Sequence, residues 1–166
     1  YPTAYPNLTL STFFQAPYIY VASADTGVFV VDASDPHNPE LVGHHIFEPL
    51  LRAGQVQAIG DLLVTGAAEE ARTVLNDVSV PNVLAPIPGG DFLLQEPSGR
   101  IHEPYFNNVA NGHVYYARKD SGGGLFIVDI REPTQPTWLG LAESFGSGGY
   151  VFVQHDKAFV GESNFA

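Results

Sequence analysis

The chain has 166 residues, of which 45% are hydrophobic, 12% aromatic and 15% charged. This is the composition of one globular domain and excludes disorder for most of the chain. Its 18 acidic and 7 basic side chains give a formal net charge of −11, which argues against nucleic acid as a partner because phosphate backbones are repelled. Cysteine is absent, so thiol catalysis and thiolate metal sites are excluded, and no apolar run is long enough for a membrane-spanning helix.

Strand-like apolar runs recur along the chain, and three of them end in the same way. Asp32, Asp77 and Asp129 each begin an Asp-x-x-x-Pro segment. Proline has no N–H to donate to a sheet, so the proline blocks further strand pairing. We expect each of these aspartates to accept hydrogen bonds from backbone N–H groups of the turn that follows.

The whole chain divides into four repeats of similar length. They cover about residues 8–53, 54–103, 104–147 and 148–166, and the last stops before its central strand. A period of about 45 residues suits a four-stranded propeller blade, and the runs are β-branched and aromatic, punctuated by Gly, Pro, Asn and Asp. The sequence therefore predicts an all-β chain: a partial β-propeller of four-stranded antiparallel blades, with about three and a half blades present.

The segments between the predicted strands are mostly turns. Glycine-containing segments at residues 25–27, 121–124 and 146–149 are predicted to be turns that use positive-φ positions. Residues 67–72 have helix-forming composition, but the repeat register places them in a hairpin loop with at most one helical turn. Longer inserts between blades are expected at residues 47–52 and 86–104.

Two of the strand-ending runs resemble a known repeat. Phe29-Val30-Val31-Asp32 and Phe126-Ile127-Val128-Asp129, each followed by a proline four residues after the aspartate, are similar to the LVIVD-type repeat of bacterial and archaeal β-propellers. The resemblance implies a propeller fold and an extracellular, cell-surface or periplasmic location. It implies no particular reaction.

A propeller contains about four to eight blades, and this chain supplies three and a fraction. The expected partners therefore include the remaining blades of the same propeller, on further sequence or on other copies of the chain. Because the chain lacks Met and ends within a repeat, we expect it to be a processed or excised piece.

No catalytic motif is apparent: the Gly-x-Ser-x-Gly elbow and the P-loop lysine are both missing. We therefore expect a non-enzymatic binding or scaffolding module without a cofactor, which holds a protein or carbohydrate partner through inter-blade loops and the channel mouth. Candidate ligand-binding residues lie in or near the expected inner strands: Gln55, Gln57, Asn107, His102 and His155.

Two alternatives stay open at this stage. In the first, the protein is a metal-dependent enzyme whose divalent ion lies in the channel, with His102, Glu103 and His155 as ligands. In the second, the chain is a structural subunit of a surface layer or filament, in which blade edges pair with neighbouring molecules.

Overall fold

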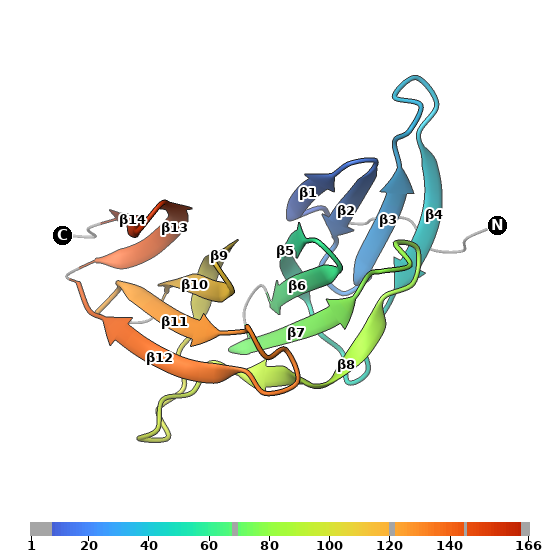
Figure 1. Cartoon of the computed structure of the whole chain (residues 1–166). Helices are drawn as coiled ribbons and strands as arrows, with labels where there is room; N and C mark the ends of the chain where they lie inside the picture. The colour runs from blue at the N-terminus through green and yellow to red at the C-terminus, as the bar shows by residue number, and fades with distance from the viewer. Residues whose placement is uncertain (1–7, 68–69, 120–121, 145, 164–166) are drawn as a thin grey trace. The chain divides into compact units, whose positions relative to one another are not determined.

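The computed structural model describes residues 8–67, 70–119, 122–144 and 146–163. These residues form β-strands joined by turns and loops, and they contain no helix (Figure 1). The strands make three four-stranded antiparallel sheets and one two-stranded sheet, in which consecutive strands are neighbours. The fold is a β-propeller of four-stranded blades, with three blades complete and two strands of a fourth, as the sequence predicts.

Each blade is built from consecutive strands. The first contains β1 (Ser11–Gln15), β2 (Tyr18–Ala22), β3 (Val28–Asp32) and β4 (Glu40–His45). The second contains β5 (Ala53–Ile59), β6 (Leu62–Ala67), β7 (Arg72–Asp77) and β8 (Ala85–Leu93). The third contains β9 (Pro104–Ala110), β10 (His113–Arg118), β11 (Leu125–Asp129) and β12 (Thr137–Ala142). The last two strands are β13 (Ser147–Gln154) and β14 (Lys157–Ser163).

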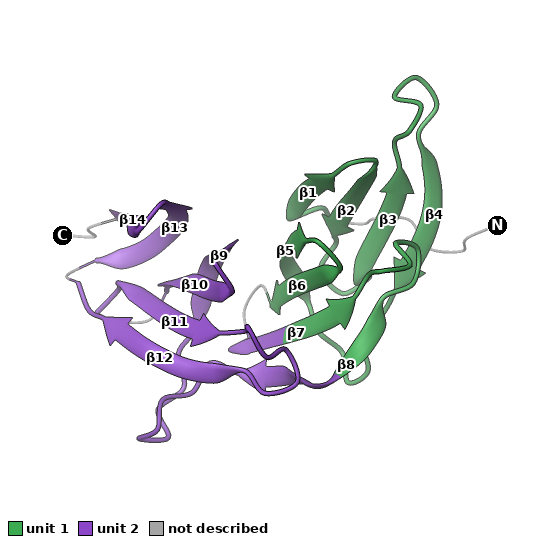
Figure 2. Cartoon of the chain, viewed as in Figure 1, with its two compact units in different colours: residues 1–68, 74–87 green, residues 69–73, 88–166 purple. Residues whose placement is uncertain are grey.

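The chain divides into two compact units, coloured separately in Figure 2. Unit 1 contains residues 1–68 and 74–87, and unit 2 contains residues 69–73 and 88–166. Within the described residues, no helix is long and apolar enough to cross a membrane.

The core of unit 1 lies between the first two blades. Tyr20 of β2 and Val30 of β3 are buried there with Val56 of β5 and Leu63 of β6. Each of these four residues belongs to a run of alternating or continuous apolar residues. One face of its strand is therefore apolar and packs in the core. A polar contact also joins β1 to β5: the Val56 backbone N–H donates a hydrogen bond to the Ser11 hydroxyl at 3.0 Å.

The core of unit 2 joins the third blade to the β13–β14 hairpin. Ala117 and Leu125 of the blade are buried with Val151 of β13, and Val153 and Val160 pack against them. The Val153 backbone N–H donates to the side-chain oxygen of Asn108 in β9 at 3.3 Å. Inner strands of successive blades are thus joined by a side-chain-to-backbone hydrogen bond in both units.

The turns between strands follow the sequence prediction in the first and third blades. The β2–β3 turn uses positive φ at Ala24 and Gly27, and the β10–β11 turn uses it at residues 122–124. The expectation for residues 67–72 partly lies outside the described residues, but Ala67 ends β6 and Arg72 begins β7. The repeat register therefore predicts this region better than its helix-forming composition does.

Two expectations about loops were wrong. Residues 86–93 belong to the outer strand β8 rather than to an insert, and only the segment after Leu93 leaves the sheet. Prolines within β8 are tolerated because an outer strand has one unpaired edge. Gly148 and Gly149 are part of β13 and not of a turn, since the strand accommodates them with a register shift before Val151.

Candidate binding sites on the repeat loops

The aspartate that ends the third strand of each complete blade forms the same turn. The carboxylates of Asp32, Asp77 and Asp129 each accept a hydrogen bond from the backbone N–H two residues later, at 2.8, 2.7 and 2.9 Å respectively. This confirms the predicted role of these residues. The turn fixes the direction of the loop that leads to the outer strand.

These hydrogen bonds also fix the charge of the loops. The pKa of Asp129 is lowered to about 2. The largest cause is its hydrogen bonding with the Arg131 side chain, and the next is the hydrogen bond from the Arg131 backbone N–H. The pKa of Asp32 is lowered by the hydroxyl of Ser34 and then by its backbone N–H. The corresponding groups of Ser79 lower the pKa of Asp77. All three carboxylates are therefore negative at neutral pH.

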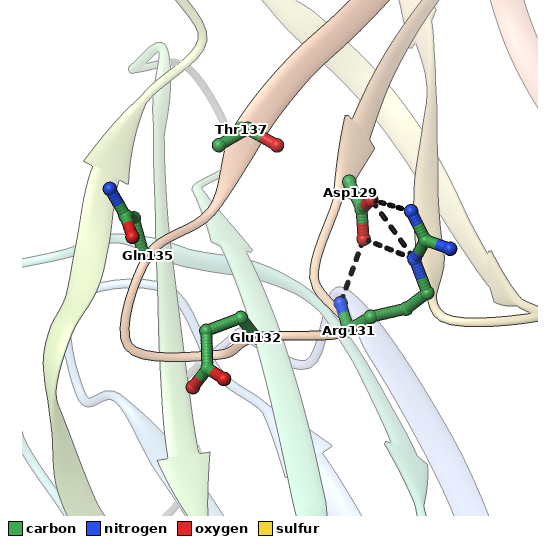
Figure 3. A pocket seen from close by; sticks show the side chains of 5 residues that line it. All are labelled: Asp129, Arg131, Glu132, Gln135 and Thr137. Atoms are coloured by element: carbon green, nitrogen blue, oxygen red, sulfur yellow. Dashed lines mark hydrogen bonds and ion pairs between the residues drawn. The ribbon is translucent and has the colours of Figure 1, made fainter.

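One of these loops borders a hollow on the surface of unit 2. The hollow has a volume of about 450 Å³ and is lined by Asp129, Arg131, Glu132, Gln135 and Thr137 (Figure 3). We call it the third-blade hollow. Its lining side chains come from the end of β11, from the loop and from the start of β12.

Unit 1 has a hollow at the corresponding place of the first blade. It measures about 210 Å³ and is lined by Asp32, Ser34, Asp35, Asn38 and Glu40. We call it the first-blade hollow. Its five lining residues correspond one by one to those of the third-blade hollow, at one constant spacing along the chain. The hollow is thus a feature of the repeat.

The two hollows differ in charge. In the third-blade hollow, Arg131 forms an ion pair with Asp129, and Thr134 donates its hydroxyl to Glu132 at 2.8 Å. Gln135 adds an exposed amide, so donors and acceptors are both present. The lining of the first-blade hollow has three carboxylates and no cation. A ligand with several hydroxyl groups suits the third-blade hollow better than an anion does.

The predicted ligand-binding residues lie elsewhere. Gln55 and Gln57 are half-buried in β5 of unit 1. Asn107, in β9 of unit 2, is 4% exposed. Gln55 and Asn107 do not take equivalent positions in their hairpins, because the hairpin registers shift them by one residue. Gln55 lies four residues before the end of β5, and Asn107 lies three before the end of β9. A shift of one residue turns a side chain to the other face of a sheet.

His102 is buried in unit 2. Its ring is fully covered, its Nε2 lies 2.5 Å from a carboxylate oxygen of Glu96, and it packs against Phe126 with ring centroids 5.3 Å apart. The hydrogen bond from His102 is the largest cause of the lowered pKa of Glu96. The pair joins the two ends of the segment that follows β8, and the same ends also meet at the Gln95–Ile101 β-bridge.

The other members of the predicted metal set are exposed. His155 lies in the β13–β14 turn with φ 56°, where its carbonyl oxygen accepts from the Asn111 side chain at 3.4 Å. The carbonyl oxygen of Glu103 accepts from the Lys119 backbone N–H at 2.8 Å. Among the described residues, no three His, Asp or Glu side chains gather in a way that suits a metal ion.

Arg118 is a buried charged residue that the sequence analysis missed. Its side chain is fully covered at the end of β10, and its Nη1 lies 3.8 Å from a carboxylate oxygen of Glu143. The only signal in the sequence is an arginine directly after the apolar run of residues 114–117. The buried guanidinium thus lies within ion-pair distance of a carboxylate in the loop after β12.

The fold and the repeated aspartate turns define a β-propeller assembled from sequence repeats. The family model described as LVIVD repeat matches residues 16–45 and 109–143. These two segments match the LVIVD repeat, as the resemblance in the sequence predicts. The two matched segments contain the β3 and β11 runs that end at Asp32 and Asp129.

Solved structures that share the fold include two computationally designed proteins. The crystal structure of the computationally designed Ika4 protein has a TM-score of 0.68 and 12% identity, and the match covers 96% of this chain and 88% of that one. For the computationally designed Ika8 protein the TM-score is 0.65 at 12% identity, covering 93% of this chain and 42% of that one. At this identity the likeness concerns the fold alone. No curated protein matches the sequence.

Proposed function

We propose that the protein is a non-enzymatic binding module of an exported β-propeller, which holds a carbohydrate partner on its repeat loops. The observation that carries the proposal is the recurrence of one hollow, with five corresponding lining residues, in the first and third blades. Loops on a rigid scaffold are a common place for binding residues.

The side chains of the third-blade hollow suit sugar hydroxyl groups. Carboxylates accept hydrogen bonds from hydroxyls, the Arg131 guanidinium donates, and the Gln135 amide and Thr137 hydroxyl do both. A hollow of about 450 Å³ is within the size range of small-molecule sites.

An extracellular, cell-surface or periplasmic location belongs to this proposal, since polysaccharides are abundant there. A protein partner on the same loops is the competing occupant. The two occupants differ in the area that they need, because a stable protein interface buries about 1,200–2,000 Å². A single hollow of this size contributes only part of such an interface.

The test is a glycan array of neutral bacterial and plant oligosaccharides, followed by calorimetric titration with the best ligand. Gln135→Ala removes an exposed amide from the hollow, and we expect it to weaken binding about 5- to 30-fold, the loss of one hydrogen bond to a ligand. Gln154→Ala, at an exposed glutamine in β13 outside the hollow, is the matched control and should leave binding unchanged.

Three outcomes contradict the proposal. The first is the absence of any glycan ligand on the array. In the second, Gln135→Ala and Gln154→Ala weaken binding equally. In the third, a protein partner captured on immobilised chain is displaced by Gln135→Ala but by no oligosaccharide, which would assign the loops to protein binding instead.

A further inference from the structure

The third-blade hollow contains a basic side chain that the other copies of the repeat lack. Arg131 follows Asp129 by two residues, and a serine holds the same place after Asp32 and after Asp77. In the first blade, the Ser34 hydroxyl donates to Asp32 at 2.6 Å. A short hydroxyl side chain is therefore enough to complete the aspartate turn, so the turn itself does not require the arginine.

The Asp129 carboxylate holds the guanidinium of Arg131 at a fixed place. The Arg131 Nε–H is shared between both carboxylate oxygens at 3.0 Å, and Nη2 donates to Oδ2 (Figure 3). The Arg131 backbone N–H donates to Oδ1 at 2.9 Å. These contacts occupy the roughly four lone-pair sites of a carboxylate. Asp129 thus keeps no acceptor site for a ligand, and its side chain serves to position Arg131.

The alkyl part of Arg131 is held as well. A Cβ on Gly112, in the turn between β9 and β10, would overlap the Cγ of Arg131 and lie 3.3 Å from its Cδ. The side chain therefore lies directly on this turn. The Gly112 carbonyl oxygen also accepts from the Ile130 backbone N–H at 2.9 Å, which fixes the residue before the arginine. A guanidinium held in this way loses little entropy when it binds a ligand.

One edge of the guanidinium is open to a ligand. Arginine has five N–H donors, and Nη1 lies on the side away from Asp129 (Figure 3). The Arg131 side chain is 69% exposed, whereas the Asp129 side chain is 13% exposed. Among the described residues, the hydrogen bonds of this guanidinium all go to Asp129. The edge formed by Nη1 and Nη2 is therefore presented to solvent.

The opening is a feature of the repeat loop. In the first blade, Ser34 has the place of Arg131, and it is exposed although the second blade follows within unit 1. The first-blade hollow is open beside it, at about 210 Å³. A following blade thus leaves this position of the loop accessible.

The open edge offers two parallel N–H groups, and a fork of this shape binds two neighbouring oxygen atoms. Hydroxyl oxygens on adjacent carbons of a sugar provide such a pair, and so does a carboxylate. The charge of the lining favours the hydroxyls, because Asp129 and Glu132 outnumber the single cation. One carboxylate oxygen of Glu132 accepts from Thr134, which leaves the other to accept a hydroxyl proton.

We infer that Arg131 is the specificity-determining residue of the third-blade hollow, that its open edge binds a pair of adjacent sugar hydroxyls, and that Asp129 is its positioning residue. The inference rests on the proposed carbohydrate binding and adds which group of the sugar is recognised. The first-blade hollow has a serine at this place and should not share the preference for that pair.

The test uses methyl glycosides of glucose, mannose and galactose, with their 2-deoxy, 3-deoxy and 4-deoxy analogues, titrated into the chain and followed by NMR of the backbone amides. We expect one glycoside to shift the amides of residues 129–137. Removing either of two adjacent hydroxyls should weaken it at least about 10-fold, because each accepts from a charged donor. Arg131→Ser should bind the parent glycoside and those two analogues equally weakly.

Three further variants separate contact, positioning and net charge. Arg131→Lys keeps the charge without the fork, so it should discriminate between the hydroxyls as poorly as Arg131→Ser does. Asp129→Asn keeps the arginine but loosens its hold, so it should weaken binding of the parent glycoside and keep part of the discrimination. Lys157→Ser is the matched control, since Lys157 is also 69% exposed but lies in β14, and it should change neither.

The results distinguish this inference from the carbohydrate proposal on which it rests. Unchanged discrimination in Arg131→Ser, or the absence of any methyl glycoside that shifts these amides, overturns the assignment of Arg131, and the glycan array then decides separately on carbohydrate binding. Methyl glucuronide that binds more tightly than methyl glucoside also overturns it, because the fork would then recognise a carboxylate. Far-ultraviolet circular dichroism of each variant verifies that the fold is retained.

Discussion

At the scale of single residues, Asn76 is the exception to the repeat pattern. It precedes Asp77 as Val31 precedes Asp32 and Val128 precedes Asp129. Its side chain is fully buried in β7, and neither amide atom has a hydrogen-bond partner among the described residues. A buried polar group without a partner costs about 1–3 kcal/mol.

Asn76→Val restores the residue that the other two copies carry. We expect it to raise the free energy of unfolding by about 1–3 kcal/mol, because the amide no longer has to be desolvated. The measurement is urea-induced unfolding followed by tryptophan fluorescence or circular dichroism, with equal m-values in both proteins.

Asn82→Val is the matched control, since Asn82 is exposed in the loop after the same strand. Surface changes of this kind stay within about 0.5 kcal/mol. If Asn76→Val left the unfolding midpoint unchanged or lowered it, the amide would have to be hydrogen-bonded in solution.

At the scale of elements, the outer strands contact the aspartate-turn loops. A Cβ placed on Gly43 of β4 would lie 2.8 Å from the carbonyl oxygen of Asn82, the residue after Pro81. Within unit 2, a Cβ on Gly89 of β8 would lie 2.2 Å from the carbonyl oxygen of Thr134, the residue after Pro133. Glycine allows each loop to approach the outer strand of the preceding blade this closely.

Gly140 of β12 occupies the same place in the third blade as Gly43 does in the first. Gly43 pairs with Val30 of β3, Gly140 pairs with Ile127 of β11, and a register shift follows each pair. A Cβ on Gly140 meets no heavy atom within 4 Å. The two glycines therefore share a position in the blade but differ in what covers them.

We expect Gly43→Ala to lower the free energy of unfolding by about 1–3 kcal/mol, because the added methyl group overlaps the backbone of the loop. Gly140→Ala should change it by no more than about 0.5 kcal/mol, or raise it slightly through lower entropy of the unfolded chain. Urea unfolding of both variants checks this. Equal losses at the two positions would mean that strand geometry, and not the loop contact, requires glycine.

At the scale of the whole molecule, the three aspartate turns link stability to pH. Asp32, Asp77 and Asp129 all have a pKa below the ordinary value in the folded state. A lowered folded-state pKa contributes stability above the unfolded-state pKa of about 4. That stability is lost as the pH falls through the folded-state value, which for Asp129 is about 2.

We therefore expect the free energy of unfolding to fall between about pH 4 and pH 2. Asp129→Asn should lose part of this dependence, because its amide does not titrate. Arg131→Gln removes the guanidinium donors but keeps the backbone N–H, so its pH dependence should lie between those of the wild type and Asp129→Asn. Urea unfolding at a series of pH values gives the slopes, and three identical slopes would contradict the assignment.

The sequence predicts some residues of the candidate sites correctly and does not predict the surroundings of others. The aspartate turns were predictable because they need only residues close together in the chain. His102 was expected to face a ligand, but it lies buried against Phe126 and Glu96, because a segment after β8 folds back over the third blade. No local pattern distinguishes that burial from exposure in a channel.

The sequence by itself determined the repeat period, the strand and turn chemistry and hence the blade architecture, because these depend on spacings of a few residues that recur in each copy. Only the tertiary structure decided which face each side chain takes, as for Gln55 and Asn107, and which surfaces are covered, as for Tyr20 and His102. A register shift of one residue reverses a face, and burial depends on segments that are distant in sequence.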